Sequence, residues 1–164
     1  MSSRLTPRER LQADGTLDPH VVAVRANGKI VDLHTPIDAT IPLTPIRDTD
    51  KDAVAVIRHS TAHVMADAVQ RLFPGTHVTI GPAIEDGFYY DFEKQGQGFT
   101  DDDLRKIEEV MADIVRKDSP FRRDVIARED AIQMFEKMGE HFKVEIIRAI
   151  PKYEEVSLFR HGGC

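Results

Sequence analysis

The spacing of apolar residues along the chain predicts three helices. Residues 51–73 carry alanine and valine on several faces, so we expect one long, largely buried helix that a Pro-Gly pair ends. After residue 98, apolar side chains recur at helical spacing behind Thr100 or an early aspartate, either of which can cap a second helix. This stripe consists of Leu104, Ile107, Val110, Met111 and Ile114. A third, shorter helix is predicted over residues 128–138, where a glycine ends it.

Short runs of β-branched and aromatic residues predict strands around these helices. Two such runs flank Asn27-Gly28, a pair typical of the type I′ turn of a β-hairpin, because that turn requires positive φ at both positions. Within HVTIGPAIEDGFYYDFE we expect a strand, a Gly-Pro turn, a hairpin turn at residues 85–87 and an aromatic strand. Further strands are predicted at residues 121–127, 142–150 and 154–162.

Together these elements predict an α+β fold in which an antiparallel sheet packs against the long helix. Residues 1–18 are polar and charged, and we expect them to form a weakly ordered lead-in. Residues 19–47 form a small β unit that is too short to be a comfortable independent domain. The main domain is expected to take residues 48–164 and to begin with acidic capping residues.

Composition narrows the classes of function. The chain has 164 residues and a formal net charge of -6, so it has no global basic field for nucleic acid, and any RNA contact would need a local basic patch. Its one cysteine, Cys164, excludes a disulfide framework and favours a reducing, cytoplasmic setting. No apolar run approaches the roughly 20 residues that a membrane-spanning helix needs, so we expect no membrane contact.

Two histidines in the segment HSTAH carry the first chemical signal. His59 and His63 are four positions apart, so a helix places both imidazoles on one face. That spacing can hold a divalent metal or set a base beside another polar group, although the glutamate of a zinc-protease helix is missing. The alternative is a pair of partly buried histidines whose neighbours satisfy their hydrogen bonds.

The aromatic strand and a lysine supply further candidates. Tyr89 and Tyr90 alternate across the predicted strand, so one hydroxyl faces the histidine helix, whereas Phe88 is interpreted as core. Lys143 lies among apolar residues of a predicted strand, where its ammonium can stabilise an anionic transition state. An ordinary lysine that blunts a sheet edge fits the same pattern. Cys164 is a weaker candidate for a metal ligand.

These motifs, taken in order, resemble a known module. The histidine pair, LFPG, IGP and GFYYDF, followed by FKVEII and EEVSLFRHG, are similar to the editing domain of the threonyl-tRNA synthetase family. Alanyl-tRNA synthetases and free-standing editing proteins share this module. The resemblance covers roughly residues 50–163. Upstream, VAVRANGKIVDLHTPIDATIPLTPI resembles the closing strands of the TGS domain, a small β-grasp unit that precedes the editing domain in that family.

The resemblance implies an activity, namely hydrolysis of the ester of seryl-tRNA that the full synthetase has mischarged in place of threonyl-tRNA. By position in the motifs it implies catalytic roles for His59, His63, Tyr90 and Lys143. It implies substrate contacts at Gly81, where a missing side chain lets the backbone approach, and at Asp91. The implied partners are tRNA and the rest of the synthetase, with a homodimer formed through domains outside this chain.

The chain also departs from the family pattern. The family completes its histidine set with a cysteine and a histidine in a CxGPH-type motif, whereas this sequence ends RHGGC, so we expect a C-terminally incomplete domain without an aminoacylation core. Editing requires no cofactor, and a zinc site would be half complete, with His59 and His63 as ligands and Cys164 as a weak third. The alternatives are a non-catalytic tRNA-binding or regulatory remnant and an unrelated metal-dependent hydrolase.

Overall fold

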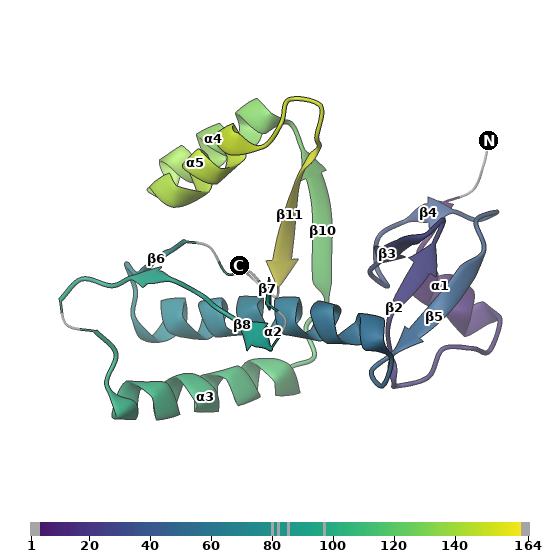
Figure 1. Ribbon diagram of the computed structural model, residues 1–164, viewed down its shortest axis with the longest axis horizontal. Coiled ribbons are helices and arrows are strands. Elements are labelled where there is room, and N and C mark those ends of the chain that lie inside the picture. Colours follow the sequence, from purple (N-terminus) through teal and green to yellow (C-terminus); the bar gives the residue numbers. More distant parts are fainter. Residues whose placement is uncertain (1–3, 80, 82, 85, 97, 162–164) are drawn as a thin grey trace. The chain divides into compact units, whose positions relative to one another are not determined.

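The computed structural model describes residues 4–79, 81, 83–84, 86–96 and 98–161, and it divides into two compact units. The first unit is Met1–Ser60 and the second is Thr61–Cys164. Helix α2 (Lys51–Leu72) crosses the boundary between them (Figure 1). Helices and antiparallel strands occur in both units, which confirms the predicted α+β class.

The first unit is built on a three-stranded antiparallel sheet with the order β3-β2-β5. Strands β2 (Val21–Ala26) and β3 (Lys29–Val31) form a hairpin, and β5 (Leu43–Arg47) pairs with the other edge of β2. The hairpin turns through Asn27 and Gly28, whose φ angles are +48° and +75°. The predicted turn is therefore confirmed in its position and in its positive φ values.

Residues 1–18 were predicted to be a weakly ordered lead-in, but their described part contains a strand and a helix. Strand β1 (Arg4–Leu5) pairs with β4 (Ile37–Asp38), and helix α1 (Pro7–Ala13) follows it. Thr6 and Glu9 form a capping box at the start of α1. Leu11 is only 3% exposed and packs in a core cluster with Val21 and Val24 of β2. One well-placed leucine and a good cap therefore order a segment whose overall polarity suggested otherwise.

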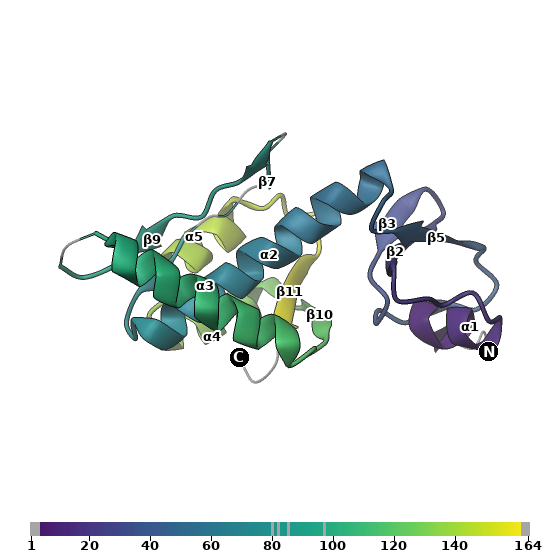
Figure 2. The same ribbon diagram turned by 90° about the horizontal axis from the view of Figure 1, so that it is seen from below.

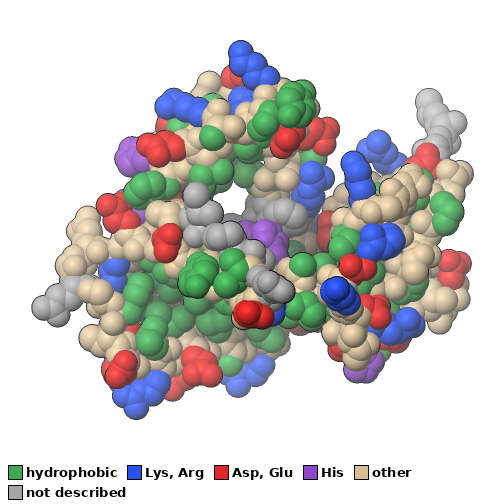
Figure 3. Space-filling view, viewed as in Figure 1, with side chains coloured by type: hydrophobic (Ala, Val, Ile, Leu, Met, Phe, Trp, Pro, Cys, Tyr) green, Lys and Arg blue, Asp and Glu red, His purple; other side chains and the backbone are tan. Residues whose placement is uncertain are grey.

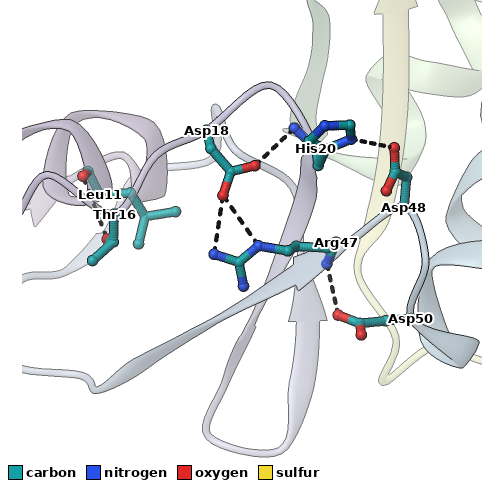
Figure 4. Close-up of polar contacts among 7 residues, drawn as sticks. All are labelled: Leu11, Thr16, Asp18, His20, Arg47, Asp48 and Asp50. Carbon is teal, nitrogen blue, oxygen red and sulfur yellow. Dashed lines mark hydrogen bonds and ion pairs between the residues drawn. The ribbon is translucent and has the colours of Figure 1, made fainter.

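A polar network links the start of β2 to the end of β5, which lie side by side at one end of this sheet (Figure 4). Asp18 accepts from the backbone N–H of His20 and, through its other oxygen, from the side chain of Arg47. The His20 ring lies 2.9 Å from Asp48 Oδ2, and this carboxylate raises the pKa of His20 above its usual value. The side chain of Asp50 accepts from the Arg47 backbone N–H at 2.7 Å. These contacts fix the turn that leads from β5 into α2.

The core of the second unit forms where α2 packs against helix α3 (Asp101–Arg116). Val64, Ala68 and Val69 from α2 are buried together with Ile107 and Ile114 from α3. Thr100 caps α3 by accepting from the backbone N–H of Asp103, as predicted. Apolar side chains gather over the region between these two helices in Figure 3.

Short antiparallel pairs follow α2. Strand β6 (His77–Val78) pairs with β9 (Phe92–Glu93), and β7 (Ala83–Ile84) pairs with β8 (Gly87–Phe88). Strands β7 and β8 flank the hairpin turn predicted at residues 85–87, of which residue 85 lies outside the described residues. Among the described residues these are separate two-stranded sheets, so the strands of the second unit do not form the one continuous sheet that the sequence suggested.

A long hairpin and two helices complete the second unit. Strand β10 (Phe121–Ile126) pairs along its length with β11 (Val156–His161), and helices α4 (Arg128–Lys137) and α5 (His141–Ala149) are inserted between them (Figure 1). The strand predicted at 142–150 is thus wrong, because this segment is α5. Val144 and Ile147, three residues apart, are both 4% exposed and face Phe135, whereas Ile146 is 36% exposed. The buried positions follow helical spacing and not alternation.

We predict that Ile114→Ala destabilises the fold strongly. Ile114 is 2% exposed at the α2–α3 contact, so its truncation leaves a cavity and should lower the free energy of unfolding by about 2–5 kcal/mol. Urea denaturation followed by circular dichroism measures this loss. The matched control is Leu104→Ala on the same helix, where the leucine is 54% exposed and about 0.5 kcal/mol or less should be lost. Equal losses in both variants would contradict the packing described.

Candidate functional site

Both histidines of the HSTAH motif lie on α2, one turn apart. His63 belongs to the second unit and is partly buried, with its ring 6.2 Å from the ring of Phe121 at the start of β10. His59 belongs to the end of the first unit. His59 is an exposed residue, yet the protein around its ring desolvates the imidazole enough to lower its pKa below the usual value. A neutral His59 can accept a proton at neutral pH.

Gly81 and Tyr90 lie in direct contact. A Cβ built on Gly81 would lie 2.9 Å from Tyr90 Cγ and closer still to two other atoms of that ring, which no real side chain tolerates. The Tyr90 ring also stacks on Phe92, with centroids 5.1 Å apart and planes 18° apart. Only glycine fits beneath the ring at position 81. This contact gives Gly81 a structural role of its own, and its predicted approach to substrate stays a prediction.

Tyr90 lies in an environment that keeps its hydroxyl neutral. Burial raises the pKa of Tyr90, and the negative charge of Glu140 raises it further. The neighbouring Tyr89 is 64% exposed, so the two tyrosines differ in burial as predicted, but they lie between β8 and β9 and not within the predicted strand. Tyr90 is therefore a hydrogen-bond donor near a buried carboxylate.

That carboxylate, Glu140, is the centre of a polar cluster that the sequence reasoning missed. Glu140 is 7% exposed and lies immediately before α5. Its Oε1 accepts a hydrogen bond of 3.2 Å from Gln70 Nε2 on α2 and lies 3.7 Å from Lys143 Nζ on α5. The cluster thus joins α2 to the start of α5 through two residues that are 70 positions apart in sequence. No local pattern marks such a pairing; the only signal was a glutamate three positions before a candidate lysine.

Lys143 is positioned by its helix. The side chain is 28% exposed, and its ammonium lies 5.2 Å from the centroid of the Phe135 ring on α4 as well as near Glu140. The predicted strand placed this lysine on a sheet edge. The helix instead places it one turn after Glu140, where an ammonium lies between a carboxylate and an aromatic face.

Two predicted site residues remain, Asp91 and Cys164. The side chain of Asp91 is exposed, and its backbone carbonyl accepts from the N–H and the hydroxyl of Thr79 at 3.1 and 2.8 Å. Cys164 lies outside the described residues. Within the described part of the chain, no three histidine, cysteine or acidic side chains gather as a metal would require. His59 and His63 would by themselves supply only two of the four ligands of a tetrahedral zinc.

Comparison with known proteins places the chain in a class. No family model matches it. Curated relatives that match are threonine–tRNA ligases: that of Thiobacillus denitrificans is 52% identical over 142 residues, that of Acidithiobacillus ferrooxidans 50% over 141 and that of Marinobacter nauticus 48% over 141. The chain is therefore homologous to part of an aminoacyl-tRNA ligase. The particular ligases are those for threonine, which confirms the resemblance predicted from the motifs.

The extent of these matches limits what they establish. Each match covers 86% of this chain and 22% of the relative, so the chain spans about a fifth of the length of the ligases it resembles. Among the residues that the structure describes, no helix is both long and apolar enough to cross a membrane. The activity, substrates and partners of the whole ligases come to this chain only as proposals.

We predict that His59 and His20 titrate on opposite sides of the usual histidine pKa of about 6.5. Desolvation lowers the pKa of His59, whereas Asp48 raises that of His20. Nitrogen-detected NMR of the imidazoles over pH 4.5 to 9 measures both values, and His59→Gln and His20→Gln assign the signals. A pKa for His59 equal to or above that of His20 would contradict this environment.

A second prediction concerns Gly81→Ala. The added methyl group must displace the Tyr90 ring, so Tyr90 should move toward solvent and its pKa should fall toward the ordinary value. Absorbance at 295 nm during alkaline titration reports tyrosinate formation, and Tyr90→Phe identifies the contribution of this residue. The matched control is Gly98→Ala, because nothing lies within 4 Å of a Cβ at that position. An unchanged titration in Gly81→Ala would mean that the ring does not rest on the glycine.

Proposed function

We propose that this chain is the editing region of a threonyl-tRNA synthetase and hydrolyses the ester of seryl-tRNA mischarged in place of threonyl-tRNA. The observation that supports it most is the Glu140 cluster. Lys143 and Tyr90, two residues implied by the resemblance, both interact electrostatically with this one buried carboxylate, and Gly81 supports the Tyr90 ring. The homology to threonine–tRNA ligases supplies the substrate class.

The reaction that we propose is attack of water on the aminoacyl ester. A histidine of α2, with His59 as the leading candidate because its ring is kept neutral, takes the proton of the attacking water. The carbonyl oxygen becomes negative as the carbon becomes tetrahedral, and the Lys143 ammonium stabilises that charge. The ester C–O bond then breaks, the 3′-terminal ribose oxygen of the tRNA takes the proton, and serine is released.

Selectivity for serine needs more than apolar contact. A single missing methylene or methyl group in an apolar pocket discriminates by only about 10–200-fold. We therefore propose that the site excludes threonine sterically, as a second sieve after aminoacylation. In this proposal the first unit is TGS-like, tRNA and the rest of the synthetase are the partners, dimerisation occurs through other domains, and the protein is cytoplasmic. Zinc plays no required part.

The test is hydrolysis of seryl-tRNA for threonine by the 164-residue chain. We expect the wild-type chain to release serine faster than the buffer, to leave threonyl-tRNA largely intact, and to lose this activity in the His59→Ala/His63→Ala variant. His34→Ala, a histidine of the first unit outside the motif, is the control and should keep full activity. A wild-type rate equal to that of the buffer would favour the alternative, a tRNA-binding remnant without catalysis.

A further inference from the structure

The buried carboxylate of Glu140 is only half satisfied. Within the described part of the chain, its Oε2 is buried and has no hydrogen-bond partner. Asp67, which is as buried at 8% exposure, shows the usual solution: Arg71 donates to both of its oxygens, at 2.7 and 2.6 Å. Burying a carboxylate without full hydrogen bonding costs free energy. The burial of Glu140 therefore requires an explanation, whereas that of Asp67 does not.

The groups around Glu140 hold its carboxylate in one place. The Gln70 amide donates to Glu140 Oε1 and also lies 3.4 Å from the backbone carbonyl of Thr76, which is itself 4% exposed. The side-chain amide is therefore tied at two points. Glu140 also lies at the N-terminus of α5, where the positive end of the helix dipole favours an anion. The hydrogen bond from Gln70 and the helix dipole both hold the negative charge of Glu140 at this position.

Electrostatic attraction holds the Lys143 ammonium, and its N–H groups stay available for further hydrogen bonds. Its distance of 3.7 Å from Glu140 Oε1 exceeds the 2.7–3.2 Å of an N–H···O hydrogen bond. Its second contact is the Phe135 ring, which attracts a cation without accepting a hydrogen bond in the usual sense. An ammonium carries three N–H donors, and this arrangement places the cation while leaving donors for another oxygen.

We propose that Glu140 is a positioning residue that holds the Lys143 ammonium in place for the ester hydrolysis. This inference rests on the proposed function. Glu140 acts through Lys143 and does not itself touch the substrate, because its free oxygen is buried. Its charge holds the cation within reach of the developing oxyanion, and the separation of 3.7 Å leaves the N–H donors of the ammonium for the substrate.

The experiment compares seryl-tRNA hydrolysis in wild type, Glu140→Gln, Lys143→Met and the double variant. Glutamine keeps the size of the side chain and removes the charge, so Glu140→Gln should lower kcat by about 10-fold to 100-fold with little change in KM. In the Lys143→Met background the same change should cost less than about twofold, since the residue it positions is gone. The control is Glu136→Gln, an exposed glutamate of α4 that should keep the wild-type rate.

Two results would overturn the inference. One is a wild-type kcat in folded Glu140→Gln. The other is an equal fold-loss from Glu140→Gln with and without Lys143, which would mean that Glu140 acts structurally or through another group. Melting curves establish that each variant is folded.

An independent measurement covers the case in which Glu140→Gln does not fold. In the unaltered chain, the two Hε protons of Lys143 should have different NMR shifts because the side chain is fixed, whereas those of the exposed Lys152 should coincide. Coincident Hε shifts for Lys143 would overturn the proposal. This measurement does not depend on catalysis. If Lys143 is ordered but the chain is inactive, the proposed function is contradicted while the positioning of Lys143 still holds.

Discussion

The packing of α2 against α3 is the constraint on which the second unit depends. Ala68 and Val69 are 0% and 1% exposed, so α2 presents small side chains that let Ile107 and Ile114 approach closely. Phe121, at the start of β10, packs on the same cluster and also contacts the His63 ring. The apolar cluster that stabilises this unit therefore also packs beside a candidate catalytic side chain.

The polar cluster depends on the same helix. Gln70 follows Val69 directly, so the rotation of α2 that buries Val69 also sets where the Gln70 amide points. The hydrogen bond from Gln70 positions Glu140 relative to α2. The ion pair between Glu140 and Lys143 in turn positions the lysine relative to the same helix. A site assembled in this way needs no long-range rigidity of its short strands. It depends on two helices, α2 and α5. Apolar contacts hold α2 against α3 and α5 against α4.

Local signals explain which parts of the fold were predictable. Asn27-Gly28 specifies its turn through backbone sterics alone, and Thr100 caps α3 through a side chain three residues from its partner. The strand prediction for residues 142–150 failed because the segment fits two patterns. Phe142, Val144 and Ile146 alternate as in a strand, and Val144 and Ile147 have the spacing of a helix. Only packing against Phe135 decides between the two. Gly81, Tyr90 and Lys143 were predicted from motifs. Gln70 and Glu140 were missed because their hydrogen bond joins distant segments.

The protonation states of His59 and Tyr90 agree with the roles that we propose for these residues. Desolvation lowers the pKa of His59, so its imidazole is neutral and can accept a proton near pH 7. Burial and the charge of Glu140 raise the pKa of Tyr90, so its phenol stays protonated and can donate. Ester hydrolysis by water needs an acceptor for the proton of water and donors or cations for the developing oxyanion. The negative charge of Glu140 attracts the Lys143 ammonium and adds to the effect of burial in raising the pKa of Tyr90.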